Sequence, residues 1–107
     1  MDAELLTIPE CPHTGAAFRL FRAALDLEGI TDSLMVREIR TEDEAAALSF
    51  HGSPTFSLNG TDLFPSSAEP ALACRVYPTP DGLSGQPALE TLRAAIRTSR
   101  PTGWPRD

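Results

Sequence analysis

Hydrophobic and polar positions along the chain predict elements in the order β-α-β-α-β-β-α. Apolar runs predict strands over residues 4–9 and 34–39. Between them, apolar residues recur every three to four positions, which predicts a helix from Thr14 to Glu28 that Gly29 ends. Because a helix joins these two strands, we expect them to be parallel, with a right-handed crossover.

The middle of the chain predicts a short helix and a hairpin. Thr41 followed by Glu44 has the spacing of a capping box, which predicts a helix that runs to about Ser49. Residues 55–64 are rich in β-forming side chains and are interrupted by Asn59-Gly60. This dipeptide favours a type I′ turn, so we expect an antiparallel hairpin here.

The remaining chain predicts one more helix and two irregular stretches. Pro87 is typical of a first helical turn, and the helix that follows has an apolar stripe at Leu89, Leu92, Ala95 and Ile96. Residues 65–86 are rich in Pro, Ser, Gly and Ala and predict no long element. Residues 99–107 are expected to form a tail, with Trp104 on the surface. The pattern predicts one α/β domain over residues 1–98, with a central mixed sheet flanked by helices.

Composition limits the partners of such a domain. The 107 residues are 41% hydrophobic and 22% charged, as in soluble globular chains, and can build one core. The net charge of −6 argues against nucleic acid and anionic membranes, which bind basic surfaces. All nine basic residues are arginine, a bias typical of high-GC bacterial genomes. The start of the chain lacks the basic head of a signal peptide, which favours a cytoplasmic location, where thiols stay reduced.

The candidate chemistry lies in Cys11-Pro12-His13-Thr14, between the first strand and the first helix. Unpaired N–H groups and the helix dipole favour a thiolate at this place. A protonated His13 would lower the pKa of the Cys11 thiol further or act as a general acid or base; an exposed histidine without a role is the alternative. A reactive Cys11 competes with an inert, buried one.

Thr14 occupies the position of the second cysteine in a thiol-redox C-x-x-C motif. Its hydroxyl either caps the helix, which we favour, or hydrogen-bonds the Cys11 thiolate. Without a second thiol here, a mixed disulfide at Cys11 needs a resolving group from elsewhere. Cys74, beside Arg75, is one candidate; it could instead share a soft metal with Cys11 or be an inert core residue.

No metal site or cofactor is predicted from the remaining ligand-type residues. Two cysteines do not make a structural zinc site, and His13 and His51 lack the spacing of zinc ligands. We expect His51 to be structural. No phosphate-binding loop and no paired carboxylates are present in the sequence.

Two motifs resemble the thioredoxin-like superfamily. Residues 50–60, with Ser53-Pro54, are similar to the thioredoxin segment in which a cis-proline opens the third strand, and Cys11-Pro12-His13 is similar to the Cys-Pro-His of periplasmic disulfide-forming oxidants. With Cys74-Arg75-Val76-Tyr77 and Ser84-Gly85-Gln86-Pro87, the chain resembles small bacterial thioredoxin-family proteins with a single-cysteine motif. Some of these are named after alkylmercury lyase, a reaction whose residues cannot be placed here.

This resemblance implies a thioredoxin-like fold over residues 4–98, with an unusual insertion at 65–86. It implies a cis bond before Pro54, where the alternative is an ordinary turn proline. It also implies a substrate groove bordered by Pro12, Ser53 and Pro54, in which the Ser53 backbone pairs with a bound peptide or glutathione.

The leading functional hypothesis is an atypical thiol-disulfide oxidoreductase. Cys11 is its nucleophile, His13 and Thr14 adjust the thiolate, and Cys74 resolves the intermediate. The substrate is a thiol or disulfide, on a protein or a low-molecular-weight molecule. The alternatives are a non-catalytic binding module, a soft-metal protein of mercury or copper type, and a degenerate scaffold with an exposed sheet edge. The sequence predicts no particular oligomeric state.

Overall fold

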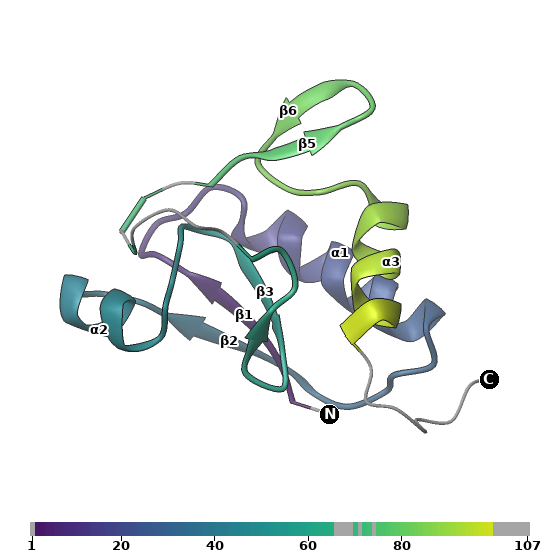
Figure 1. The fold of residues 1–107 in the computed structure, drawn as a ribbon, viewed down its shortest axis with the longest axis horizontal. Coiled ribbons are helices and arrows are strands. Elements are labelled where there is room, and N and C mark those ends of the chain that lie inside the picture. Colours follow the sequence, from purple (N-terminus) through teal and green to yellow (C-terminus); the bar gives the residue numbers. More distant parts are fainter. Residues whose placement is uncertain (1, 66–69, 71, 74, 100–107) are drawn as a thin grey trace.

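The computed structural model describes residues 2–65, 70, 72–73 and 75–99, a mixed α/β fold around a four-stranded sheet (Figure 1). Strand β1 (Ala3–Thr7) is parallel to β2 (Leu34–Glu38) and antiparallel to β3 (Thr55–Leu58). Strand β4 (Thr61–Asp62) pairs antiparallel with β3, which gives the order β2-β1-β3-β4. The predicted mixed sheet, with its parallel first pair and its hairpin, is confirmed.

Three helices accompany this sheet: α1 (Thr14–Leu27), α2 (Glu42–Ala47) and α3 (Leu89–Ser99). Their bounds lie within two residues of the predicted ones. The capping box is also confirmed, because the Glu44 N–H donates to Thr41 Oγ1 at 3.0 Å. Local sequence signals therefore set the ends of α2 even though only one of its residues is buried.

Helices cover both faces of the sheet because successive residues of β1 point to opposite sides. Leu5 packs in the larger core cluster with Phe21 of α1 and Leu92 of α3. Leu6 packs on the other face, in a smaller cluster with Ala45 of α2. Figure 1 shows this arrangement, with α2 to the left of the strands and α1 and α3 to the right. The predicted flanking of a central sheet by helices is confirmed.

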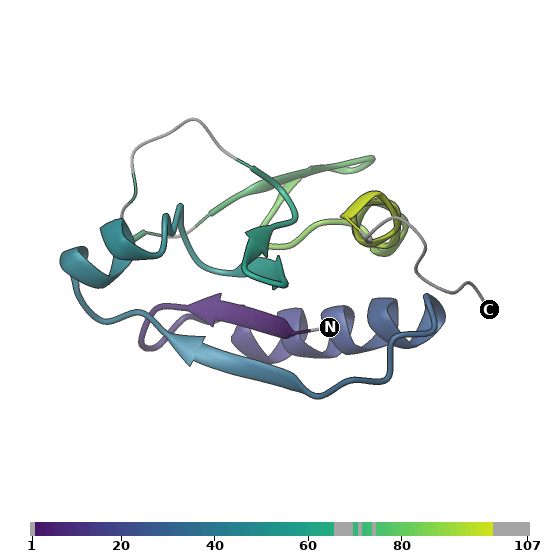
Figure 2. The ribbon, with the colours of Figure 1, turned by 60° about the horizontal axis from the view of Figure 1, so that its bottom comes forward.

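Ion pairs join the last helix to the end of the first. The Arg93 guanidinium donates to the Glu28 carboxylate at 2.8 Å, and Arg97 lies 3.7 Å from the other oxygen of the same carboxylate. Only 6% of the Glu28 side chain is exposed. Figure 2 shows α3 nearly end-on, above α1 in the picture. This attachment lies at the end of α1 that is remote from Cys11.

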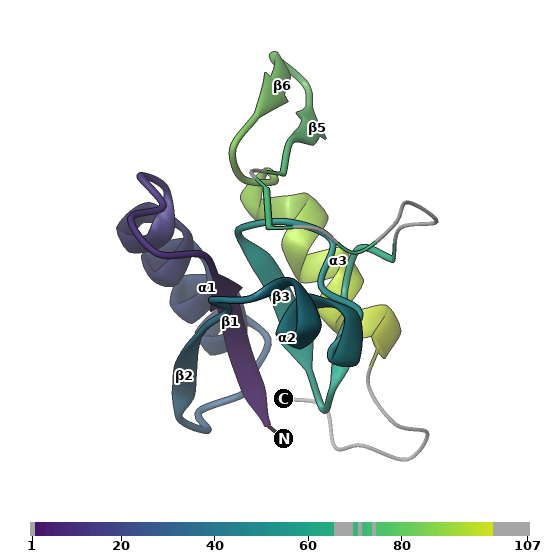
Figure 3. The same cartoon turned by 90° about the vertical axis from the view of Figure 1, so that its left-hand side faces the viewer.

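The segment 65–86 contains a hairpin that the sequence pattern did not predict. Strands β5 (Tyr77–Thr79) and β6 (Gly82–Ser84) pair antiparallel and project away from the rest of the fold (Figures 1 and 3). Pro78 lies inside β5, and the proline-rich composition hides the alternation that marks a strand. Leu83 of this hairpin is 74% exposed. The predicted irregular insertion therefore contains one short hairpin.

Tyr77 connects this hairpin to the core. The centre of its ring is 5.8 Å from the ring centre of Phe56 and 5.2 Å from that of Phe64, and both contacts are edge-on. Phe56 is itself edge-on to Phe21 of α1 at 5.2 Å. Such aromatic pairs stabilise beyond the area that they bury. The first residue of the hairpin is thus packed against the sheet.

Candidate functional site

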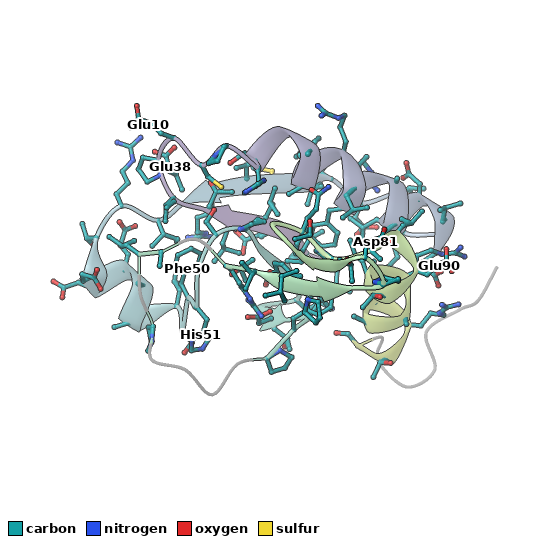
Figure 4. The ribbon with its side chains drawn as sticks, turned by 90° about the horizontal axis from the view of Figure 1, so that it is seen from above. Glu10, Glu38, Phe50, His51, Asp81 and Glu90 are labelled. Carbon is teal, nitrogen blue, oxygen red and sulfur yellow. The ribbon has the colours of Figure 1, made fainter. Side chains whose placement is uncertain are left out.

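The predicted site residues leave the sheet at one end. In the register of β1 and β3, Leu6 lies opposite Thr55. The chain that follows β1 toward Cys11 and the chain that precedes β3 at Ser53-Pro54 therefore reach the same end of the sheet. Figure 4 shows Glu10, the residue before Cys11, at the same end of the molecule as Glu38, the last residue of β2.

Cys11 is a free, half-buried thiol in the turn that leads into α1. Its N–H donates to the Ile8 carbonyl and its carbonyl accepts from the Thr14 N–H, each at 3.3 Å. The N–H groups of Gly15 and Ala16 have no hydrogen-bond partner among the described residues. Unpaired N–H groups and the positive end of the helix dipole favour negative charge at the start of α1. The turn thus brings the thiol to an end of the helix suited to an anion.

Thr14 does not cap the helix, and that prediction is wrong. The N-cap position belongs to His13, whose side chain makes no capping hydrogen bond. Thr14 is the first helical residue, one position too late for its hydroxyl to reach the N–H groups of the first turn. Within the described residues the Thr14 hydroxyl forms no hydrogen bond with Cys11 either. The start of α1 therefore has no side-chain cap from Thr14 or His13.

His13 is half-buried, and its imidazole lies directly on Gly85. A Cβ at Gly85 would come within 2.5 Å of His13 Nε2 and 2.7 Å of Cδ2, distances that real Cβ atoms do not reach. The lack of a side chain at Gly85 thus makes room for the ring. Sequence reasoning did not connect these residues, although Gly85 belongs to one of the resembling motifs. His13 is thus less exposed than the alternative of a solvent-exposed histidine without a role assumed, and a role for it stays a prediction.

Ser53 and Pro54 are both buried, and the bond between them is cis, as predicted. Ser53 donates its N–H to the Ala73 carbonyl and accepts from the Arg75 N–H, both at 2.8 Å. Its hydroxyl is buried and has no hydrogen-bond partner within the described part of the chain. Pro12, the other predicted border of the groove, is exposed next to Cys11. The Ser53 main chain is therefore paired with the chain itself.

Arg75 and Tyr77 fix this pairing in place. The Arg75 guanidinium donates to Asp62 Oδ2 at 2.9 Å, to Thr55 Oγ1 at 3.3 Å and to the Phe64 carbonyl. It also lies 4.9 Å from the centre of the Tyr77 ring, a cation–π distance. The Tyr77 hydroxyl donates to the Pro54 carbonyl. Sequence reasoning missed this network, because nothing local marks Asp62 as the partner of an arginine thirteen positions later.

The predictions for Cys74, the proposed resolving cysteine, and for Trp104 stay predictions. Both residues lie outside the described part of the chain. His51 is half-buried, and its Nδ1 is buried without a hydrogen-bond partner among the described residues. In that same part of the chain, no three His, Cys, Asp or Glu side chains gather to hold a metal ion.

No protein family, curated protein or solved structure matches this chain. No helix among the described residues is long and apolar enough to cross a membrane. A surface hollow lined by residues such as Asp2, Glu4 and Met35 lies at the opposite end of β1 from Cys11. It shares no residue with the site around Cys11.

The contact between His13 and Gly85 gives a direct test. Gly85→Ala should displace the imidazole and cost about 1–3 kcal/mol of the free energy of unfolding, because the added Cβ overlaps the ring. In NMR spectra of the two histidines, the ring signals of His13 should shift and those of His51 should not. Gly15→Ala is the matched control, since its Cβ would meet only Arg19 Nη1 at an ordinary 3.6 Å. Unchanged His13 signals in Gly85→Ala would contradict the contact.

The burial of Tyr77 predicts a dependence of stability on pH. Burial, the largest cause, and the charge of Asp62 raise the pKa of Tyr77 far above 10, against an opposing effect of Arg75. Above pH 10 the tyrosine ionises in the unfolded chain but not in the folded one, so stability falls as the pH rises. Between pH 9 and 11 the free energy of unfolding should drop by about 1.4 kcal/mol more than in Tyr77→Phe.

Urea unfolding of both chains at the two pH values measures this difference. Tyr77 is the only tyrosine, so its ultraviolet absorbance also reports its ionisation directly. Tyrosinate absorbance that rises near pH 10 in the folded protein would show that Tyr77 is not held as described.

Proposed function

We propose that this chain is an atypical thioredoxin-like thiol-redox protein in which Cys11 attacks a disulfide bond. One observation carries the proposal: the free thiol of Cys11 lies in the turn that leads into α1, where the N–H groups of Gly15 and Ala16 have no partner among the described residues. Only the thiolate is the nucleophile, and this position favours negative charge. His13, two residues later, is held in place by its contact with Gly85.

The arrangement of the sheet supports the thioredoxin-like assignment over residues 4–98. The strand order β2-β1-β3-β4 has a parallel first pair and an antiparallel hairpin, with α1 and α3 on one face and α2 on the other. Cys11 at the start of α1 and Ser53-Pro54 at the start of β3 reach the same end of this sheet. The insertion at 65–86, with its β5–β6 hairpin, is the departure from the simple pattern.

The proposed reaction begins with attack of the Cys11 thiolate on one sulfur of a disulfide RSSR. A bond forms between Cys11 Sγ and that sulfur, and the S–S bond of the substrate breaks. The leaving sulfur takes the electron pair and is released as a thiol after it gains a proton, for which the imidazole of His13, two residues along the chain, is the proposed donor. Cys11 is oxidised to a mixed disulfide while half of RSSR is reduced.

The second step needs another thiol, because Thr14 replaces the usual one. We assign it to Cys74: its thiolate would attack Cys11 Sγ, release the second RSH and leave a Cys11–Cys74 disulfide. The neighbours of Cys74 in the sequence, Ala73 and Arg75, are both hydrogen-bonded to Ser53, at the end of the sheet to which Cys11 also belongs.

Alkylation at pH 6 tests the nucleophile. In a Cys74→Ser background, Cys11 should react with iodoacetamide at least ten times faster than free cysteine, of which only a small fraction is thiolate at that pH. His13→Gln should slow this reaction severalfold, because the imidazole proposed to assist Cys11 is lost. Arg97→Gln, which removes a charge at the far end of the fold, is the control. Labelling at the rate of free cysteine would contradict the proposal.

Mass spectrometry after treatment with hydroxyethyl disulfide tests the second step. The wild-type chain should end two hydrogens lighter, with no adduct, because Cys74 displaces the bound half of the reagent. Cys74→Ser should keep the adduct on Cys11, and Cys11→Ser should not form the internal disulfide. An adduct that persists equally in the wild-type and Cys74→Ser chains would remove Cys74 from the mechanism.

A further inference from the structure

The main-chain N–H and carbonyl of Ser53 are both already paired within the chain. Its N–H donates to the Ala73 carbonyl and its carbonyl accepts from the Arg75 N–H, both at 2.8 Å. Extended peptides that bind by strand addition need free N–H and C=O groups on the receptor. We call the described residues Ala73, Arg75, Val76 and Tyr77 the strap, because they cross the start of β3 at this point.

The strap packs too closely to be a loose covering. A Cβ at Gly52 would come within 3.0 Å of Arg75 Cβ and 3.2 Å of the Ala73 carbonyl oxygen. Gly52 also has a φ of +119°, which favours glycine. The absence of a side chain at Gly52 therefore allows the strap to approach the backbone before Ser53.

The strap is fastened by charge and by burial. The Arg75–Asp62 ion pair, at 2.9 Å, leaves only 10% of the arginine and 17% of the aspartate side chain exposed. At the other end, the buried Tyr77 donates its hydroxyl to the Pro54 carbonyl and packs among aromatic rings. A peptide that displaced the strap would leave a partly buried charge without its partner, which is strongly unfavourable. The strap is thus built to stay in place.

We infer that the strap restricts Cys11 to small disulfides and excludes extended peptides from the Ser53 backbone. This rests on the proposed function, whose substrate class it narrows to low-molecular-weight disulfides. The step is the exchange described above: the Cys11–S–S–R bond forms, the S–S bond of RSSR breaks, and the leaving half departs as a thiol. A small disulfide requires no main-chain pairing, so the strap does not oppose it.

Two probes with the same leaving group separate size from reactivity. One is the 2-pyridyl disulfide of cysteamine, and the other is the 2-pyridyl disulfide of a cysteine in the centre of a ten-residue peptide. The release of pyridine-2-thione by the full-length Cys74→Ser protein measures the rate of reaction at Cys11 for each probe. Each rate is then divided by the rate at which free cysteine reacts with the same probe, which gives a normalised rate. We expect the small probe to react at least ten times faster than the peptide probe on this scale.

Loosening the strap should remove the discrimination. Arg75→Ala, in the same background, should raise the normalised rate of the peptide probe about tenfold and change that of the small probe less than twofold. Arg93→Ala is the matched control, because it also removes an arginine from a close ion pair. The Arg93–Glu28 pair, at 2.8 Å, involves α3 and not the strap. This control should leave the ratio of the two rates unchanged. If circular dichroism shows that Arg75→Ala does not fold, Tyr77→Phe replaces it with the same expectation.

The outcomes distinguish the two proposals. Two outcomes would overturn the role of the strap without rejecting a reactive Cys11. In one, both probes react faster than with free cysteine by the same factor. In the other, Arg75→Ala and Tyr77→Phe leave the ratio of the two normalised rates unchanged. Reaction of both probes no faster than with free cysteine would instead reject the proposed function itself.

Discussion

The two hydrogen bonds between the Ser53 main chain and the residues on either side of position 74 connect the irregular part of the chain to the sheet. They are short, and the Arg75–Asp62 ion pair and the buried Tyr77 ring support them. Two isolated main-chain hydrogen bonds contribute little to stability. Here, breaking them would also separate a partly buried charge from its partner. The position of the insertion, and with it the surroundings of the candidate site, follows from this contact.

The second constraint is electrostatic and local. Helix α1 begins without a side-chain cap, and among the described residues the N–H groups of Gly15 and Ala16 have no partner, which favours an anion near them. Cys11 lies in the turn that leads into this end of the helix. His13 holds its position because Gly85 has no side chain. The loop before α3 therefore shapes the start of α1, although more than seventy residues separate them. The site is assembled from three parts of the chain: the turn at 11–14, the backbone at 52–54 and the segment at 73–85.

Signals that act over a few residues could be predicted from the sequence. Thr41 and Glu44 form their capping box, and the Asn59-Gly60 turn has the positive φ values, 54° and 80°, that a type I′ turn needs. The cap assigned to Thr14 failed because helix starts shift by one residue without a visible change in pattern. The β5–β6 hairpin, the Arg75–Asp62 pair and the contact of His13 with Gly85 depend on tertiary packing. No periodicity or motif encodes them, and the thioredoxin-like assignment itself remains a proposal.

The central claim is that Cys11, at the start of α1, attacks disulfides as a nucleophile. The rate at which the Cys74→Ser chain reacts with a small disulfide, folded and then unfolded in urea at the same pH, tests it most directly. The Cys11→Ser, Cys74→Ser double variant serves as the blank. The account predicts that the folded chain reacts about ten times faster than the unfolded one, whereas equal rates in the two states would contradict it.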